Sequence, residues 1–299
     1  MTPHQWQAAG QYLDFRQRRI FFRQSEAGRT SVLLIHGFPT ASWDWNRLWP
    51  ELSRHFQLIA ADMLGFGFSD KPRRYSYTTA EQADLQEALL ARLNLKQVHI
   101  LAHDYGNTVA QELLARQLAG NLSFEILSVV FLNGGLFPDV HRPRPIQKIL
   151  MSPVGPYLTP FLGKPSLART FRRIFGPHTQ ASEEEIDQFW SLIEFHNGKT
   201  VIPRLIRYMQ ERVHFRDRWV GALQKSLLPM LLINGSFDPI SGKHLATYYR
   251  KVVPQAQVVE IESVGHYPQF EAPARVIEHY LDFFRRHFSD KPNGQVKEG

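Results

Sequence analysis

The sequence contains no cysteine among its 299 residues, which excludes disulfide bonds, thiolate metal sites and a cysteine nucleophile. It also lacks any run of about 18 apolar residues, the length that a membrane-spanning helix requires. Residues 1–10 lack the charged and apolar blocks of a secretory signal peptide. We therefore expect a cytoplasmic protein without a membrane span.

Acidic residues are fewer than basic ones, 28 against 35, which gives a net charge of +7 when histidine is neutral. Most of this excess lies in residues 136–226, which hold 14 Lys and Arg and 8 Asp and Glu. Arginines spaced along amphipathic helices usually form a solvated face, and no nucleic-acid-binding motif accompanies them. We therefore expect no nucleic-acid partner.

Short apolar runs alternate with helical patterns through most of the chain, which predicts a doubly wound, mostly parallel α/β sheet. The clearest of these expected strands are residues 32–35, 56–60, 97–101 and 126–132. Residues 10–24 contain two shorter runs of mixed character, which predict an antiparallel hairpin at the edge of the sheet.

The alternation stops at residues 136–226, where prolines and helical patterns occur without a convincing strand. This segment predicts an inserted helical domain, and the longest of its expected helices covers residues 200–223. The core then consists of residues 1–135 and 227–288. The polar end of the chain, residues 289–299, is expected to be disordered.

The stretch AHDYGN, residues 102–107, lies between an expected strand and an expected helix. A tight turn at this junction strains the backbone of its central residue and needs small neighbours, which Ala102 and Gly106 provide. The pattern is typical of a nucleophile elbow, with Asp104 in the position where a serine is commoner.

Two further loops follow strands of the expected sheet and carry groups that can assist Asp104. Asp238 follows the strand that ends near residue 234, and His266 follows the last strand. Ligands of parallel sheets bind at the carboxyl ends of the strands, so the three side chains are expected to meet there. The order nucleophile, acid, base is that of α/β-hydrolases. The alternative acid position holds Asn133, which cannot carry a charge.

Four motifs resemble the epoxide hydrolase and haloalkane dehalogenase branch of the α/β-hydrolase superfamily: HGFP at residues 36–39, DMLGFGFSDKP at 62–72, HDYG at 103–106 and GHYPQFE at 265–271. The stretches AHDYGNTVAQELLAR, NGGLFPDVHRP and FRDRWVGAL are similar to the mesoderm-specific transcript (MEST)-like group. The resemblance covers nearly the whole chain. It implies an eight-stranded, mostly parallel sheet with helices on both faces and a helical cap.

An aspartate at the elbow predicts a two-step reaction. A carboxylate with a pKa of about 3.9 is ionised at neutral pH and can attack a saturated carbon directly, forming an alkyl ester. His266 then activates a water that hydrolyses the ester, while Asp238 orients the imidazole. The resemblance and the elbow geometry assign the oxyanion hole to the backbone N–H groups of Phe38 and Tyr105. The reaction needs a small apolar electrophile and water, and no cofactor or metal.

The resemblance also limits the leaving group. Haloalkane dehalogenases of this type hold the halide with side-chain N–H donors at the positions of Tyr105 and Phe38, and a phenylalanine offers none. Epoxide hydrolases share HGFP, and their cap tyrosines donate to the epoxide oxygen as the ring opens. Tyr208 and Tyr157 are the candidates for such tyrosines here, with Tyr157 binding substrate.

We therefore predict an epoxide hydrolase-like enzyme. Haloalkane dehalogenation is the first alternative, and a ligand-sensing or interaction protein with low turnover on the same fold is the second. Ester hydrolysis is disfavoured, because attack of Asp104 on an acyl carbon would produce an anhydride.

Overall fold

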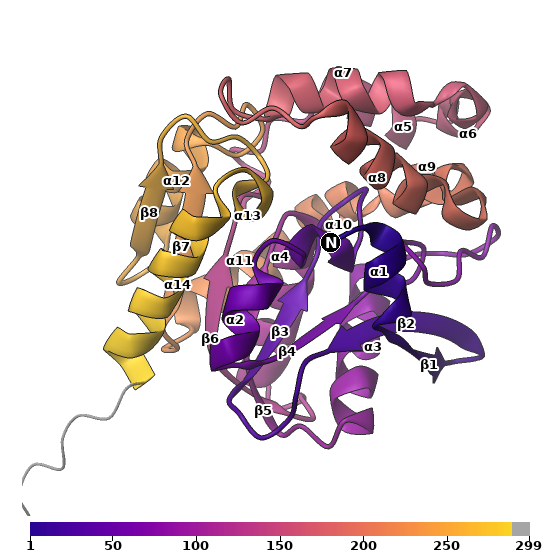
Figure 1. Ribbon diagram of the computed structural model, residues 1–299. Helices are drawn as coiled ribbons and strands as arrows, with labels where there is room; N and C mark the ends of the chain where they lie inside the picture. Colours follow the sequence, from indigo (N-terminus) through magenta and orange to yellow (C-terminus); the bar gives the residue numbers. More distant parts are fainter. Residues whose placement is uncertain (289–299) are drawn as a thin grey trace, which may run out of the picture.

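The computed structural model describes residues 1–288, apart from the side chain of Pro160. Its strands form a single eight-stranded sheet in the order β1-β2-β4-β3-β5-β6-β7-β8 (Figure 1). Strand β2 is antiparallel to β1 and β4, and all other neighbours are parallel. The predicted mostly parallel sheet and its edge hairpin are confirmed. The strands are β1 Gln11–Phe15, β2 Arg18–Gln24, β3 Ser31–Ile35, β4 Gln57–Ala61, β5 Gln97–Ala102, β6 Glu125–Phe131, β7 Met230–Gly235 and β8 Gln257–Ile261.

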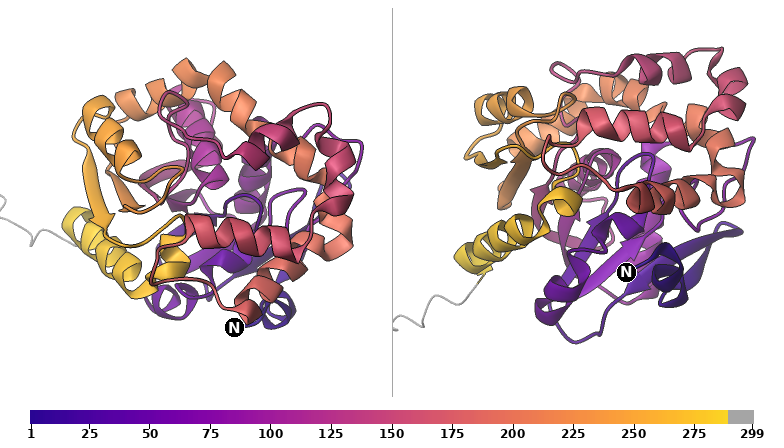
Figure 2. Two further views of the ribbon diagram at one scale, coloured as in Figure 1. Left: turned by 90° about the horizontal axis from the view of Figure 1, so that it is seen from above. Right: turned by 45° about the horizontal axis from the view of Figure 1, so that its top comes forward.

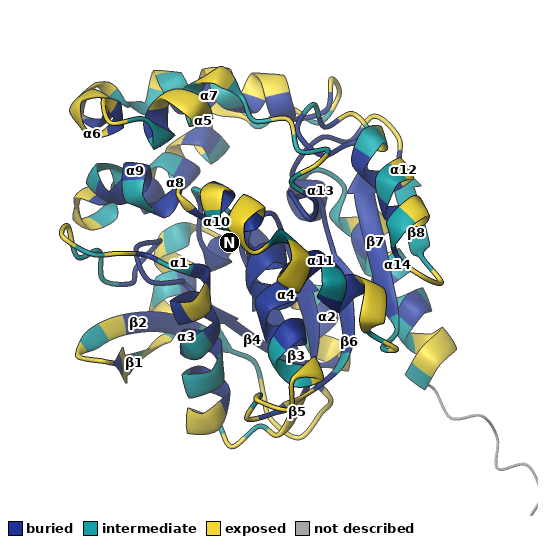
Figure 3. Cartoon of the chain, turned by 180° about the vertical axis from the view of Figure 1, so that it is seen from behind, coloured by how far each residue is buried: buried dark blue, intermediate teal, exposed yellow. Residues whose placement is uncertain are grey.

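The central strands form the core. Every residue of β3 and β4 is buried, as expected for parallel strands covered by helices on both faces. The edge strands β1 and β8 are less buried, and Figure 3 shows this contrast by colour. The rigid centre therefore carries the loops that follow β3 and β5.

Helices of the core pack in two groups on opposite faces of the sheet (Figure 1). On one face α4 packs between α3 and α11. On the other face Phe56, which directly follows α2, packs against Tyr280 and Phe284 of α14. The core helices are α1 Pro3–Ala8, η1 Ser42–Trp45, α2 Trp49–His55, α3 Thr79–Arg92, α4 Tyr105–Leu118, α12 Lys243–Val252, α13 Pro268–Glu271 and α14 Pro273–Phe288.

The segment between β6 and β7 contains helices and no strand, and the whole of it lies within the described residues. Figures 1 and 2 show much of it lying across one end of the sheet, where we call it the cap. Its elements are α5 Pro145–Met151, α6 Gly155–Leu158, η2 Thr159–Phe161, α7 Lys164–Ile174, α8 Glu183–Glu194, η3 Phe195–Val201, α9 Ile202–Leu205, α10 Tyr208–His214 and α11 Arg216–Lys225.

The single helix predicted over residues 200–223 is wrong. The segment breaks at residues 206–207 and again at Phe215, which separates α9, α10 and α11. Tertiary packing overrides the helical propensity of the sequence here. The breaks allow α10 to bury Tyr208 and Arg212, while α11 buries Trp219.

Within residues 1–288, no helix combines the length and the apolar character needed to cross a membrane. The prediction of a disordered tail over residues 289–299 lies outside the described part of the chain.

Candidate active site

Asp104 occupies the turn between β5 and α4, with backbone angles of φ 46° and ψ −105°. A positive φ is strained for a residue with a Cβ, and such strain persists only where the surroundings enforce it. The small neighbours are required here, because a Cβ at Gly106 would lie 2.1 Å from the carbonyl oxygen of Ile35. The strand-to-helix turn therefore holds the carboxylate at the end of β5.

The two predicted partner loops bring their side chains to the same place. Nδ1 of His266 lies 2.7 Å from Oδ2 of Asp238, and its Nε2 lies 3.9 Å from Oδ1 of Asp104. Asn133 donates from Nδ2 to Asp238 Oδ2 at 3.0 Å. The residue at the alternative acid position thus helps to hold the Asp238 carboxylate. Backbone N–H groups of Ile240 and Ser241 donate to the same carboxylate. Asp238 is thereby fixed in its ionised form.

The buried charges shift one another's pKa values. Burial raises the pKa of the Asp238 carboxyl, but the charge and hydrogen bond of His266 outweigh it and hold the value at about 2. Burial likewise lowers the pKa of His266, yet the carboxylates of Asp238 and Asp104 raise it to about 9. Asp104 has a lowered pKa, because His266 and Arg212 oppose the effect of its burial. At neutral pH the resting site therefore holds two carboxylates and an imidazolium.

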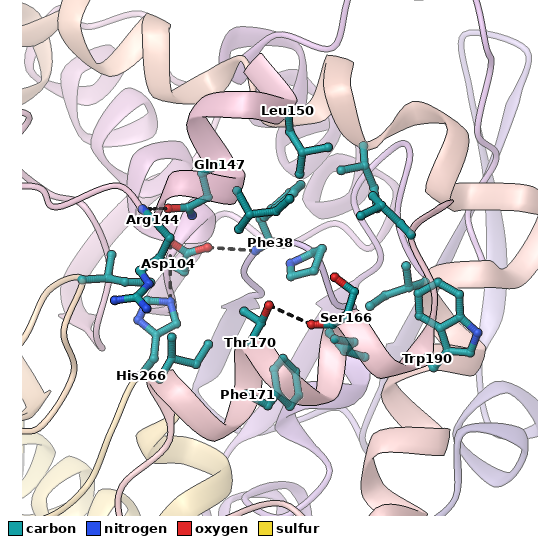
Figure 4. Close-up of a pocket in the computed structure, with 18 of the residues that line it drawn as sticks. Phe38, Asp104, Arg144, Gln147, Leu150, Ser166, Thr170, Phe171, Trp190 and His266 are labelled. Atoms are coloured by element: carbon teal, nitrogen blue, oxygen red, sulfur yellow. Dashed lines mark hydrogen bonds and ion pairs between the residues drawn. The ribbon is translucent and has the colours of Figure 1, made fainter. Parts of the chain in front are cut away.

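Of the two predicted oxyanion donors, the N–H of Phe38 donates to Oδ2 of Asp104 at 3.0 Å (Figure 4). The N–H of Tyr105, the first residue of α4, makes no hydrogen bond to any residue in the described part of the chain. Both groups belong to the turns that flank the carboxylate. They are available to a negative charge that develops on Asp104.

The two cap tyrosines lie in different environments. Tyr208 is buried and its ring stacks on Tyr105, with 4.2 Å between ring centroids. Burial and the nearby Asp104 carboxylate raise the pKa of the Tyr208 hydroxyl well above its usual range. Tyr157 is 78% exposed in the short helix α6, and neither tyrosine is among the residues that line the cavity beside Asp104. The structure therefore does not place Tyr157 in the wall of this cavity, and its binding of substrate stays a prediction.

A cavity of about 110 Å³ lies between the cap and the core, with Asp104 and His266 in its wall (Figure 4). Apolar residues form most of the lining, and most of these belong to the cap, among them Leu150, Leu167, Phe171, Trp190, Ile193 and Ile202. Tyr267, next to His266, also lines the cavity, and its hydroxyl lies 3.5 Å from the carbonyl oxygen of Phe38. Such a cavity suits a small apolar molecule. In residues 1–288 no group of three or more His, Asp or Glu side chains is arranged to hold a metal ion.

Sequence reasoning missed Arg212, which it placed with the solvated arginines of the cap. Arg212 is 3% exposed, and its Nη2 lies 3.8 Å from Oδ1 of Asp104. The available signal was its spacing from Tyr208, because residues four apart share one face of a helix. That spacing identifies a shared face, but not the carboxylate that the face covers.

Comparisons with known proteins agree with this architecture. A family model described as the alpha/beta hydrolase fold matches residues 30–273. The mesoderm-specific transcript homolog protein of Bos taurus is 40% identical over 293 residues, which covers 94% of this chain and 87% of that protein. The predicted similarity to the MEST-like group is confirmed.

Two solved structures show the same fold. Epoxide hydrolase CorEH is 22% identical with a TM-score of 0.73, covering 93% of this chain and 98% of that one. Haloalkane dehalogenase DbeA from Bradyrhizobium elkani is 22% identical with a TM-score of 0.78, covering 93% and 97%. At this identity the likeness concerns the fold and does not separate the two reactions. Together, the matched family model and the similarity over nearly its whole length show that the chain belongs to the α/β hydrolase fold family.

Proposed function

We propose that the protein is a hydrolase that opens epoxides of small apolar molecules through an alkyl ester on Asp104. The observation that carries the proposal is the chemistry at the elbow. A carboxylate occupies the position of the nucleophile, accepts a hydrogen bond from Phe38, and lies 3.9 Å from the His266 ring. An ionised carboxylate that faces an apolar cavity is suited to attack on a saturated carbon.

In the first step an Asp104 oxygen bonds to an epoxide carbon, and the bond from that carbon to the ring oxygen breaks. The ring oxygen leaves as an alkoxide and takes a proton from the hydroxyl of Tyr208, which its raised pKa keeps protonated. His266, protonated in the resting site, returns a proton to the tyrosine. The step ends with a neutral ester and a neutral imidazole.

In the second step the neutral His266 takes a proton from water, and the resulting hydroxide adds to the ester carbonyl. The negative charge develops on an Asp104 oxygen beside the N–H groups of Phe38 and Tyr105. The adduct releases the diol oxygen, which takes the proton from His266. The Asp104 carboxyl group then returns its own proton to His266, so that the carboxylate and the imidazolium of the resting site are restored. Asp238 holds the imidazole in the required tautomer throughout.

The side chains near the elbow favour an epoxide over a haloalkane. A departing halide needs hydrogen-bond donors in a dry cavity, and Phe38 has no donor in its side chain. An opening epoxide needs one proton donor, which Tyr208 supplies. Release of bromide from bromoalkanes without formation of diols from epoxides would favour the dehalogenase alternative.

The ester mechanism can be tested with water labelled with oxygen-18. A panel that includes styrene oxide and epoxyhexane is screened for consumption, and a single turnover is run with enzyme in excess. The diol should contain no label, because its new oxygen comes from Asp104, and the peptide that contains Asp104 should gain the label. A labelled diol with an unlabelled peptide would show direct attack of water on the epoxide.

Replacing Tyr208 with phenylalanine should lower kcat for epoxides by about 10²-fold, because the alkoxide then leaves without a proton donor. The matched variant is Tyr267→Phe, which removes the hydroxyl of the other tyrosine beside Phe38. It should retain most of the activity in steady-state diol formation. The reverse pattern would assign the proton donor to Tyr267.

A further inference from the structure

The cap helix α10 places a buried arginine against the nucleophile. Nη2 of Arg212 donates to the backbone carbonyl of Asp104 at 3.0 Å and lies 3.8 Å from its Oδ1. Nε donates to the hydroxyl of Thr108, one turn into α4, at 2.7 Å. Among the described residues, Asp104 is the only carboxylate within 4.0 Å of this guanidinium. Its charge is therefore balanced mainly by the group that reacts.

Little else compensates this cation. Its Nη1 is buried without a hydrogen-bond partner in the described part of the protein, and the guanidinium lies over the Tyr208 ring at 4.6 Å. The fit is tight, because a Cβ at Gly135 would lie 2.3 Å from Nη1. An uncompensated buried charge is strongly destabilising. The charge of Arg212 therefore interacts mainly with Asp104 and with His266 beside it.

Both Arg212 and His266 lie within 4 Å of the same atom, Oδ1 of Asp104. In the resting site the positive charges of Arg212 and His266 equal the negative charges of Asp104 and Asp238. Once Asp104 is an ester it is neutral, and Arg212 balances Asp238 only when His266 is neutral as well. The ester state thus favours the form of His266 that can accept a proton from water.

We propose that Arg212 is a positioning residue that keeps the buried cluster neutral in both states and so makes His266 a base after Asp104 is esterified. The use of Arg212 in the reaction rests on the proposed function. The electrostatic effect of Arg212 on His266 does not, because all the charged groups involved are present in the protein without substrate. Arg212 touches no reacting atom of the substrate in this scheme and acts through Asp104 and His266.

Other titratable groups also face His266 from the surrounding elements. They are His103, Tyr267, Glu271 and His141. Burial lowers the pKa of His103 and of His141 to about 3, so both are neutral above pH 5. Burial raises the pKa of Tyr267, which stays protonated. Glu271 accepts backbone hydrogen bonds from Gly265 and Tyr267, and burial raises its pKa. All four groups are present whether Asp104 is a carboxylate or an ester.

The test uses Asp104→Asn as a neutral mimic of the esterified aspartate, so it requires no substrate. The pKa of His266 is measured by NMR titration of isotopically labelled histidine, with its signal assigned by its loss in His266→Gln. Intact mass shows that the amide has not reverted to the carboxylate. In this background Arg212→Met should raise the His266 pKa by about one pKa unit, because a nearby cation has been removed.

Two further substitutions separate charge from hydrogen bonding. Arg212→Gln keeps a donor for Thr108 and should raise the His266 pKa as Arg212→Met does. Arg212→Lys keeps the charge and should leave it close to that of Asp104→Asn. Arg207→Met removes an exposed arginine one residue before α10 and should have no effect. The proposal is overturned if the His266 pKa is unchanged when Arg212→Met or Arg212→Gln is added to Asp104→Asn in a folded protein. It is also overturned if Arg212→Lys shifts the His266 pKa as much as Arg212→Met does.

A double-mutant cycle in thermal unfolding covers the case in which a neutral variant is too unstable for NMR. Arg212→Gln should destabilise the wild-type protein more than it destabilises the Asp104→Asn variant, since only the wild type has the carboxylate that Arg212 balances. Equal destabilisation in the two backgrounds counts against the coupling. Failure of the oxygen-18 experiment alongside a shifted His266 pKa would reject the proposed reaction and keep the role of Arg212.

Discussion

Replacing Asp104 with alanine should abolish epoxide hydrolysis, with kcat reduced by at least about 10⁴-fold. The expected loss is large because the carboxylate forms the bond to substrate. The other carboxylate beside His266, that of Asp238, is hydrogen-bonded to the imidazole and does not line the cavity. Binding need not be lost, because the apolar lining of the cavity is unchanged. Steady-state diol formation, together with binding of an apolar amide that resembles the epoxide, separates these two effects.

The matched control for this variant is Asp217→Ala, which removes a carboxylate that is 96% exposed on α11. It should retain wild-type turnover and stability, since a single exposed ion pair contributes little. Circular dichroism establishes that both variants are folded. Residual diol formation by folded Asp104→Ala within tenfold of wild type would rule out the carboxylate as nucleophile.

The positions of Asp104, Asp238 and His266 at one edge of the sheet could be predicted, because each residue follows a local signal. Ala102 and Gly106 mark the strained turn around Asp104, and parallel strands bring the loops that follow them to one edge of the sheet. The structure accordingly places His266 within hydrogen-bonding distance of Asp238 and within ion-pair distance of Asp104. Asn133 could be excluded as the acid from its chemistry, and the structure gives it a supporting contact to Asp238.

The cap was less predictable, since its residues act through tertiary packing. Periodicity identifies one face of a helix but not the element that the face covers. For this reason the sequence predicts a surface position for Arg212, which lies against Asp104, and a position in the site for Tyr157, which is largely exposed. The helix predicted over residues 200–223 failed for the same reason, because its two breaks serve contacts with the core.

Replacing His266 with glutamine should produce the second large effect, an accumulation of alkyl-enzyme. Asp104 remains ionised in this variant, and Tyr208 still protonates the leaving oxygen. Tyr208 then regains its proton from solvent instead of from His266, so the first step proceeds. The second step lacks its base, and steady-state turnover should fall by about 10⁴-fold or more. Intact mass after incubation with styrene oxide should increase by the mass of one substrate molecule, and peptide mapping should place the adduct on Asp104.

Because ester breakdown requires neutral His266, the wild-type rate of this step should decrease as pH falls through the pKa of His266 in the ester state. That pKa is lower than the value of about 9 in the resting site, since the Asp104 charge that helps to raise it is gone. His178→Gln, which alters an exposed histidine of the cap, should leave the pH profile unchanged. If wild type consumes the epoxide while folded His266→Gln forms no adduct, the ester mechanism is wrong. If His266→Gln turns over normally, a group other than His266 activates the water.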